Sequence, residues 1–345
     1  MTGTVQTDLD VVAVGESMVL LSPPAGSRLV DATTLEVHAA GAEANVAVHL
    51  ARFGCRSAWV GKLGADPLGQ RVVSTLRDLC VDVSAVEFDE LMPTGVYFKD
   101  FNGSETEVHY YRSGSAATTL SASAVEPVLR RARVLHMSGI TAALSPHCHS
   151  LVEALLLRAR SYGVTASFDV NYRPSLWDVE RAGPSLTRLA RLADIVFVGR
   201  DEAERVWGVS TSTELRRLLS TVPTIVLKDG GVGATVVGPE HTTFVPAPRV
   251  TVVEPVGAGD AFAAGYLWGL LDGQPEDVRL RRGHLAASAA MRSVSDHAPM
   301  PPKEWFVSLS QLRSSDWAAL DLSKSAPVPG PAGNHSCRSA ARSWW

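Results

Sequence analysis

Short, uniformly apolar runs alternate along the chain with longer segments in which apolar residues recur at helical spacing. The apolar runs predict buried strands, and the amphipathic segments predict helices. The predicted strands are 11–15, 57–61, 133–139, 164–170, 194–198 and 224–228, and the predicted helices are 43–53, 68–80, 147–162, 183–193 and further helical segments up to residue 220. This alternation indicates an α/β fold in which a mostly parallel sheet carries helices on both faces.

One stretch departs from the alternation. Between residues 94 and 112, apolar and polar side chains alternate on either side of Asn102-Gly103, a dipeptide typical of a tight turn, so an antiparallel hairpin is predicted. With the extended segment near 29–38 it is expected to form a small separate sheet. The small sheet, comprising about 17–38 and 94–112, is expected to be a lid over a ligand site. Two copies of the chain could also pair through its exposed surface, forming a homo-oligomer.

The composition narrows the class of protein. Of the 345 residues, 46% are hydrophobic and 20% are charged, and the net charge is −4. This balance excludes a disordered chain and does not favour a nucleic-acid partner. The longest apolar stretch, 261–271, is shorter than the roughly 20 residues that a membrane span needs. Since the first residues also lack an export signal, we expect a cytoplasmic protein with no membrane partner.

The organisation of the chain fits one large domain, expected to span 10–315. The sequence is rich in Pro, Gly and Ser after Leu320, so 316–345 is expected to be a disordered tail. The four cysteines lie far apart and form no Cys-x-x-Cys pair. We therefore expect reduced thiols and neither a zinc site nor a disulfide framework.

The strongest chemical signal is the segment 255–271, where a glycine-rich turn leads directly into a predicted amphipathic helix. The amides of Gly257, Ala258 and Gly259 are expected to lie unpaired at the positive end of this helix and to form an anion hole. Asp260 follows in the first turn, where a carboxylate can accept a proton from a hydroxyl group beside the anion. Together they suit phosphoryl transfer to an alcohol. Taken alone, a helix capped by an acidic residue explains the segment equally well.

A second glycine-rich segment, 226–238, predicts a strand, a turn and another strand, unlike the strand-to-helix turn of a Rossmann or Walker site. Gly230 and Gly233 would allow the backbone to approach a nucleotide, and Lys228 would offer a point charge to its phosphates. A plain β-hairpin is the simpler explanation of these glycines alone.

Three further clusters place polar side chains at strand ends and at a helix start, where caps, turns or a solvated edge strand are the structural alternatives. Together they predict a pocket for a polyhydroxylated, anionic ligand, because Arg binds carboxylates and Tyr and Asn bind hydroxyl groups. The clusters are Gly41, Glu43 and Asn45; Tyr110, Tyr111 and Arg112; and Asp169, Asn171 and Arg173.

Other polar residues are expected to be structural. His136 lies inside a predicted strand and has no metal-ligand spacing to another histidine, so a core role is expected. Asp66 and Gly69 are expected to be turn residues that also border the substrate. The arginine-rich run 279–282 is most simply a solvated helix face.

In this order the motifs GAEANVA, G-x-x-G-x-D-x-x-G, D-x-N-x-R, K-x-G-x-x-G and GAGDAF resemble those of the PfkB, or ribokinase-like, carbohydrate kinases. The resemblance extends over about 11–312. Within the family, the segments HYYRSGSA, HMSGITAALSP and DVNYRPSLW look like those of 2-keto-3-deoxygluconate kinases. The resemblance implies a ribokinase-like fold, ATP and Mg²⁺ as cofactors, and a sugar acid as substrate.

The resemblance also implies roles for individual residues. Asp260 would be the base that deprotonates the sugar, and Glu202 would help to place Mg²⁺ through water. The remaining implied contacts are Gly41, Asn45, Tyr97, Tyr110, Arg112, Arg173 and Asp260 with the sugar acid; Lys228, Gly230, Gly233 and His284 with ATP; and Gly257, Ala258 and Gly259 with the transferring phosphoryl group and the nucleotide.

Some positions depart from the family pattern. The usual Asn-x-x-Glu has Gly199 in place of its Asn, so the magnesium role rests on Glu202. Glu254 replaces an Asp, which leaves a monovalent-cation requirement open. Ala40 replaces a glycine, and His284 stands where many members have an Asn near adenine.

The favoured hypothesis is an ATP-dependent kinase that converts 2-keto-3-deoxygluconate to 2-keto-3-deoxy-6-phosphogluconate. The first alternative is a fructokinase- or ribokinase-like enzyme that acts on a neutral sugar, against which Arg112 and Arg173 argue. The second alternative is a non-catalytic sugar-binding or regulatory protein that keeps the fold. The presence of Asp260 and the preceding glycines argues against it.

Overall fold

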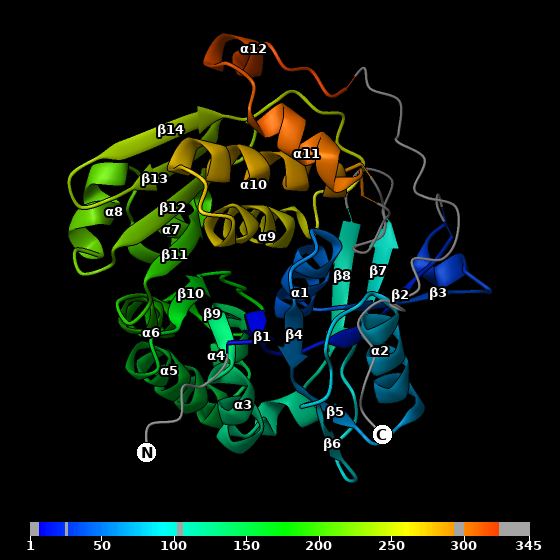
Figure 1. Ribbon diagram of the computed structural model, residues 1–345. Helices are drawn as coiled ribbons and strands as arrows, with labels where there is room; N and C mark the ends of the chain where they lie inside the picture. Colours follow the sequence, from blue (N-terminus) through cyan, green and yellow to red (C-terminus); the bar gives the residue numbers. More distant parts are fainter. Residues whose placement is uncertain (1–6, 25–26, 102–105, 293–299, 324–345) are drawn as a thin grey trace.

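The computed structural model describes residues 7–24, 27–101, 106–292 and 300–323. Figure 1 shows strands at the centre of the molecule and helices around them. The strands are β1 (Leu9–Val14), β2 (Met18–Ser22), β3 (Glu36–Ala40), β4 (Ser57–Val60), β5 (Lys62–Gly64), β6 (Glu87–Asp89), β7 (Val96–Phe101), β8 (Thr106–Tyr111), β9 (Ala132–Ser138), β10 (Thr165–Asp169), β11 (Ile195–Gly199), β12 (Thr224–Asp229), β13 (Gly233–Val237) and β14 (Thr242–Pro246). The α-helices are α1 (Ala42–Arg52), α2 (Pro67–Asp78), α3 (Ala122–Leu129), α4 (Gly139–Ala143), α5 (Pro146–Ser161), α6 (Val179–Ala190), α7 (Arg200–Trp207), α8 (Ser212–Leu218), α9 (Ala258–Leu271), α10 (Glu276–Ala290), α11 (Lys303–Ser310) and α12 (Ser314–Ala318).

The large sheet has eight strands in the order β14-β13-β12-β11-β10-β9-β1-β4. The strands from β12 to β4 run parallel to one another, whereas β13 and β14 continue the sheet as antiparallel neighbours. The predicted α/β fold with a mostly parallel sheet is therefore confirmed. Since the parallel strands all end at the same edge, the loops that follow them lie together there.

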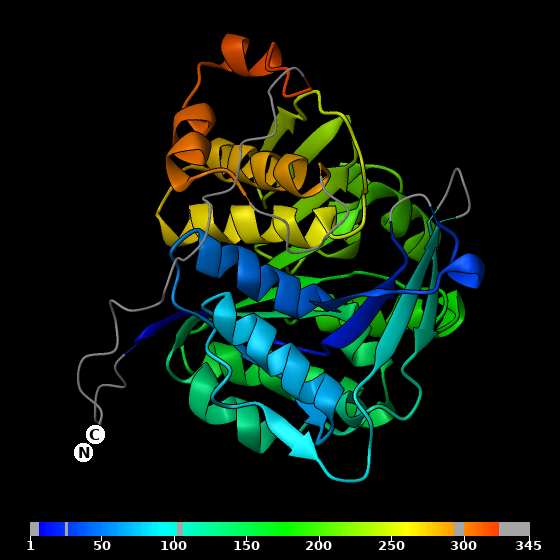
Figure 2. The ribbon, with the colours of Figure 1, turned by 90° about the vertical axis from the view of Figure 1, so that its right-hand side faces the viewer.

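The two faces of the sheet carry different helices. In β1, Val12 and Val14 pack into a core that also contains residues of α3, α5 and α6. The intervening Val11 packs on the opposite face, in a core with residues of α1, α9 and α10. Alternate side chains of a strand point to opposite faces, so a strand buried on both faces must be apolar throughout. Figure 2 shows α1, α9 and α10 layered over one face.

The predicted lid is a separate four-stranded sheet in the order β3-β2-β7-β8. Its hairpin, β7 and β8, is antiparallel as expected, and the predicted turn at Asn102-Gly103 lies outside the described residues. One detail of the prediction is wrong: Leu29–Asp31 is a short 3-10 helix, so the extended part of the 29–38 segment begins only at β3. The amide of Leu29 donates to the Asp100 carboxylate of β7 at 2.7 Å, and this bond holds the turn against the lid.

The smaller structural predictions have mixed outcomes. His136 is buried and bonds to the Ser167 hydroxyl, as a core residue would. Asp66 caps α2 by accepting from the amide of Gly69 at 2.8 Å. Cys80 is disulfide-bonded, so the expected reduced thiol is wrong there, because residue spacing alone does not reveal which cysteines form a disulfide. None of the described helices combines the length and apolarity required to cross a membrane.

The arginine-rich run of α10 is not a solvated face. Arg282 is 2% exposed, its guanidinium carbon lies 3.8 Å from the ring centroid of Trp268, and it donates to Asp272. Arg281 is also buried, beside the ring of Trp317. Aromatic faces and hydrogen-bond acceptors compensate these buried charges, which a local charge pattern does not show.

Part of the predicted tail, 316–323, lies in the described residues, whereas 324–345 lie outside them. Trp317 in α12 is 2% exposed, and its indole donates to the carbonyl of Pro246 at 2.9 Å. Leu322 is buried as well, and its amide donates to the carbonyl of Arg249. Residues 316–323 therefore pack on β14 and α10, because the apolar side chains of Trp317 and Leu322 are buried there.

We expect Trp317→Ala to lower the free energy of unfolding by about 3–5 kcal/mol, the usual cost of truncating a buried aromatic side chain. Urea unfolding followed by circular dichroism measures the change. As a control, Leu91→Ala, at a position that is 93% exposed, should have an effect below about 0.5 kcal/mol. Equal unfolding midpoints for Trp317→Ala and the unaltered protein would contradict the packing role.

Candidate active site

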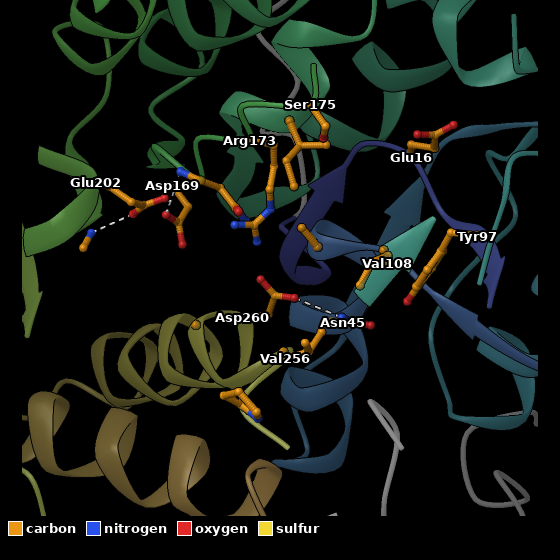
Figure 3. A pocket seen from close by; sticks show the side chains of 18 of the residues that line it. Glu16, Asn45, Tyr97, Val108, Asp169, Arg173, Ser175, Glu202, Val256 and Asp260 are labelled. Carbon is orange, nitrogen blue, oxygen red and sulfur yellow. Dashed lines mark hydrogen bonds between the residues drawn. The ribbon is translucent and has the colours of Figure 1, made fainter. Parts of the chain in front are cut away.

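A cavity of about 660 Å³ opens between the carboxyl edge of the large sheet and the lid. The loops after β1, β9, β10, β11 and β12 line one side, and β2, β7 and β8 of the lid line another. The N-terminal ends of α1 and α9 complete the wall (Figure 3). The carboxyl edge of a parallel sheet is a common ligand site, since loops from several strands converge there.

Most of the residues predicted from the sequence meet in this cavity. The predicted residues that do not line it are Glu43, Asp66, Gly69, Tyr111, Gly233, Ala258 and His284. The predicted residues that line it are Gly41, Asn45, Tyr97, Tyr110, Arg112, Asp169, Asn171, Arg173, Glu202, Lys228, Gly230, Gly257, Gly259 and Asp260. The motifs are thus brought together from distant parts of the chain by the order of the strands.

The start of α9 has the geometry of an anion-binding turn. Gly257 is the N-cap, and its φ of 83° lies in the left-handed region that favours glycine. The amide of Ala258 is not unpaired as expected, because it donates to the carbonyl of Pro255 at 3.2 Å. The next amides, of Gly259 and Asp260, lie in the first helical turn, where no intrahelical acceptor exists. This end of α9 carries the positive end of the helix dipole.

Asp260 is held toward the cavity by α1. Its Oδ2 accepts a hydrogen bond from Nδ2 of Asn45 at 2.9 Å, although the two residues are 215 positions apart. Gly41 precedes α1 and packs against the loop after β1, where an added Cβ would lie 2.2 Å from the carbonyl oxygen of Glu16. Any larger residue there would push α1 away from the sheet. The close approach at Gly41 therefore helps to place Asn45, and through it Asp260.

A charged cluster lies at the ends of β10, β11 and β12. Nζ of Lys228 donates to Oδ2 of Asp169 at 2.9 Å, and an added Cβ on Gly259 would lie 3.6 Å from the same Nζ. Burial acts to lower the pKa of Lys228, but Asp169 and Glu202 outweigh it and hold this pKa above its ordinary value. Lys228 therefore stays an ammonium beside the start of α9.

Glu202 is held by backbone groups of two neighbouring loops. Its carboxylate oxygens accept from the amide of Gly199 at 2.7 Å and from that of Tyr172 at 2.9 Å. Burial raises the pKa of Glu202, and the Lys228 ammonium opposes this rise. Glu202 thus lines the cavity, and each of its carboxylate oxygens already accepts one hydrogen bond.

At the lid end, Arg112 is ion-paired with Glu16, a buried residue that the sequence analysis did not identify. Glu16 also accepts from the Ser115 hydroxyl at 2.6 Å. The rings of Tyr97 and Tyr110 stack with centroids 5.5 Å apart. Glu16 directly follows the predicted strand 11–15, and Asp169 lies near the end of the predicted strand 164–170. A search for polar residues at strand ends, which singled out Asp169, would therefore have found Glu16 as well. Its carboxylate balances the charge of Arg112.

Arg173 differs from Arg112. Its side chain is exposed, lines the cavity and forms no ion pair with any other residue in the described part of the chain. Figure 3 shows the Arg173 guanidinium and the Asp260 carboxylate pointing into the same space from opposite walls. The cavity therefore offers a cation and a carboxylate facing one another.

His284 lies in the core, away from the cavity. Its Nε2 bonds to the carbonyl of Val245 at 3.1 Å, and its ring packs edge-to-face on Phe262. Burial lowers its pKa to about 4, so the ring is neutral. Gly233 lies in β13, paired with Pro246 of β14. The plain β-hairpin considered for Gly233 therefore accounts for its position, and His284 is a core residue.

The chain is similar in sequence to known carbohydrate kinases. The model of the pfkB family carbohydrate kinases matches residues 8–303. The 2-dehydro-3-deoxygluconokinase of Bacillus subtilis is 35% identical over 303 residues, which are 86% of this chain and 94% of that protein. The 2-dehydro-3-deoxygalactonokinase of Haloferax volcanii is 32% identical and covers 86% of this chain and 95% of its own.

A solved structure of similar shape is the 2-dehydro-3-deoxygluconokinase of Thermotoga maritima. It is 27% identical, has a TM-score of 0.80, and covers 88% of this chain and 100% of its own. Fold and sequence thus point to the same group of proteins. The chain belongs to the pfkB family of carbohydrate kinases.

Proposed function

We propose that this kinase transfers the γ-phosphoryl group of ATP to a sugar acid, 2-keto-3-deoxygluconate, and forms 2-keto-3-deoxy-6-phosphogluconate. The observation that carries the proposal is the placement of Arg173 and Asp260 on opposite walls of one cavity. An arginine without an ion partner is suited to a carboxylate, and an aspartate at a helix start is suited to a hydroxyl group beside a phosphate. The relatives named for 2-dehydro-3-deoxygluconate, the same compound, support this substrate.

In the proposed reaction, Asp260 accepts the proton of the sugar hydroxyl while that oxygen forms a bond to the γ-phosphorus of ATP. The bond between the γ-phosphorus and the β–γ bridging oxygen breaks, and ADP leaves. Asn45 donates to Oδ2 of Asp260, and this hydrogen bond orients the carboxylate for the proton transfer. The positive end of α9 stabilises the charge on the transferring group.

The nucleotide side of the cavity is assigned to Lys228, Gly230 and the 257–259 turn. The Lys228 ammonium is close to Gly259 and would offset phosphate charge at the point of transfer. The carboxylates of Asp201 and Glu202 line the same region and suit Mg²⁺, which binds one or two carboxylates together with phosphates and waters. Because both Glu202 oxygens already accept backbone N–H groups, we assign Glu202 to a water-mediated contact. Bound Mg²⁺ would neutralise phosphate charge.

The acid group of the sugar is assigned chiefly to Arg173. Arg112 keeps a place at the lid end, beside Tyr97 and Tyr110, where it and the tyrosines would bind hydroxyl or keto oxygens. Since Glu16 already neutralises the charge of Arg112, an anionic group would gain less binding free energy beside Arg112 than beside Arg173. A neutral sugar remains the alternative, and the turnover of fructose and ribose distinguishes it from the sugar acid.

Asp260→Asn is expected to lower kcat by about 10²- to 10⁴-fold, because it removes the base. ATP affinity should change little, since the amides of α9 remain and the new amide oxygen can still accept from Asn45. Steady-state kinetics with coupled ADP detection and calorimetric titration with ATP measure the two effects. A variant with a kcat within a few-fold of the unaltered enzyme would show that Asp260 is not the base.

Arg173→Gln is expected to lower kcat/KM for 2-keto-3-deoxygluconate by about tenfold to a hundredfold, since a charge-assisted contact contributes about 1.5–3 kcal/mol. Turnover of fructose and ribose, already low in the unaltered enzyme, should hardly change. Arg112 is less informative, because its removal would leave Glu16 buried without a counter-ion.

A matched control is Arg188→Gln, since the Arg188 side chain is 68% exposed and pairs with Glu153 on the surface. It should leave all kinetic constants unchanged. If Arg173→Gln affects acids and neutral sugars alike, or if the unaltered enzyme prefers fructose or ribose, the sugar-acid assignment fails and the assignment as a kinase stands.

A further inference from the structure

The hairpin of the lid reaches past the cavity to the turn that precedes α9. Lys99 of β7 and Thr106 of β8 both approach the carboxylate of Glu254. Nζ of Lys99 lies 4.0 Å from Oε2 of Glu254, and the Thr106 hydroxyl lies 3.3 Å from the same oxygen. Lys99 is 4% exposed and Glu254 is 5% exposed. A buried ion pair therefore connects the lid to the 254–257 turn.

The other oxygen of Glu254 holds the turn itself. Oε1 accepts from the backbone amide of Val256 at 3.1 Å. The backbone amide of Glu254 donates to the carbonyl of Met291 at the end of α10, which anchors the start of the turn. The next residue after Val256 is Gly257, the N-cap of α9. The Glu254 carboxylate thus lies inside the turn and connects it to the lid.

Burial makes the Glu254 carboxylate depend on the Lys99 ammonium for its stability. A buried carboxylate loses its hydration and is stable only when a cation and hydrogen-bond donors replace it. Lys99 supplies the cation, while Thr106 and Val256 supply hydrogen bonds. Without the ammonium, the carboxylate would turn toward water and release the Val256 amide. The conformation of the turn therefore depends on a side chain of the lid.

We propose that Lys99 and Glu254 are positioning residues for phosphoryl transfer: the lid ammonium fixes Glu254, and Glu254 fixes the backbone that leads into the anion-binding end of α9. The proposal rests on the proposed function in one respect, that this end of α9 binds the transferring phosphoryl group. Neither side chain lines the cavity. Both act through Val256 and Gly257, so their loss should reduce kcat more than it raises KM for the sugar acid.

The test compares Lys99→Met, which removes the charge but keeps most of the volume, with the double variant Lys99→Met/Glu254→Gln. In the double variant the buried charge is gone, while the introduced glutamine can still accept from the Val256 amide. Lys99→Met should lower kcat by about tenfold to a hundredfold, the cost of a small misplacement of catalytic groups. The double variant should recover to within a few-fold of the unaltered enzyme. Arg188→Met, which breaks an exposed ion pair, is the control and should change nothing.

Hydrogen exchange of the peptide covering 254–260 provides a readout that does not require turnover. Exchange of this peptide should be at least about tenfold faster in Lys99→Met than in the unaltered protein or in Arg188→Met, because the Val256 amide loses its acceptor. If the protein phosphorylates no sugar, the proposed function fails, and the exchange result alone decides the positioning role.

Unchanged exchange at 254–260 in a folded Lys99→Met variant would overturn the proposal. So would a kcat within twofold of the unaltered enzyme when that enzyme is active. If Lys99→Met does not fold, Thr106→Val removes only one hydrogen bond to Glu254 and keeps the side-chain volume. Its exchange at 254–260 should be about two- to tenfold faster, the worth of one hydrogen bond, and unchanged exchange would again overturn the proposal.

Discussion

Buried charges around the cavity are compensated in pairs, and each pair joins two different elements of the fold. Burying an ion without a partner costs roughly several kcal/mol of folding free energy. Each pair can therefore form only when the strands, loops and lid bring its two side chains together. The pairs are Glu16 with Arg112, Asp169 with Lys228, and Glu254 with Lys99. The shape of the cavity therefore depends on charge compensation as well as on apolar packing. Moving one member of a pair in one wall is expected to displace its partner in another wall.

Against this background, Arg173 is distinct because it lines the cavity without an ion partner among the described residues. A cation that the protein leaves uncompensated beside a solvent-filled space can be compensated by an anionic ligand. The Lys228 ammonium has Asp169 as a partner, but it also lies next to the start of α9. The cavity is thus lined by two cations, of which Arg173 suits a sugar acid and Lys228 suits the phosphates of a nucleotide.

The tertiary structure also explains where the sequence-based interpretation failed. His284, Arg282 and Trp317 belong to one compact region around α10, where His284 is buried, Arg282 stacks on an indole ring and Trp317 covers Arg281. From local patterns, His284 is expected at a ligand, Arg282 in solvent and Trp317 in a tail. Polar and charged residues are mostly exposed, and the segment around Trp317 is polar and close to the end of the chain. A buried guanidinium over an aromatic ring follows no local pattern, since the ring belongs to another helix.

The sequence by itself determined the order and type of most elements, because periodicity and turn residues act over a few neighbouring positions. It also pointed to Asp260, Asn45 and Arg173, since each lies in the first turn of a helix or in the loop after a strand. Only the tertiary structure decided which of these residues meet and which charges they compensate. Asn45 and Asp260 are 215 positions apart, and Thr106 and Glu254 are 148 apart. Such pairings depend on how β-strands and helices pack in space, which local residue patterns do not encode.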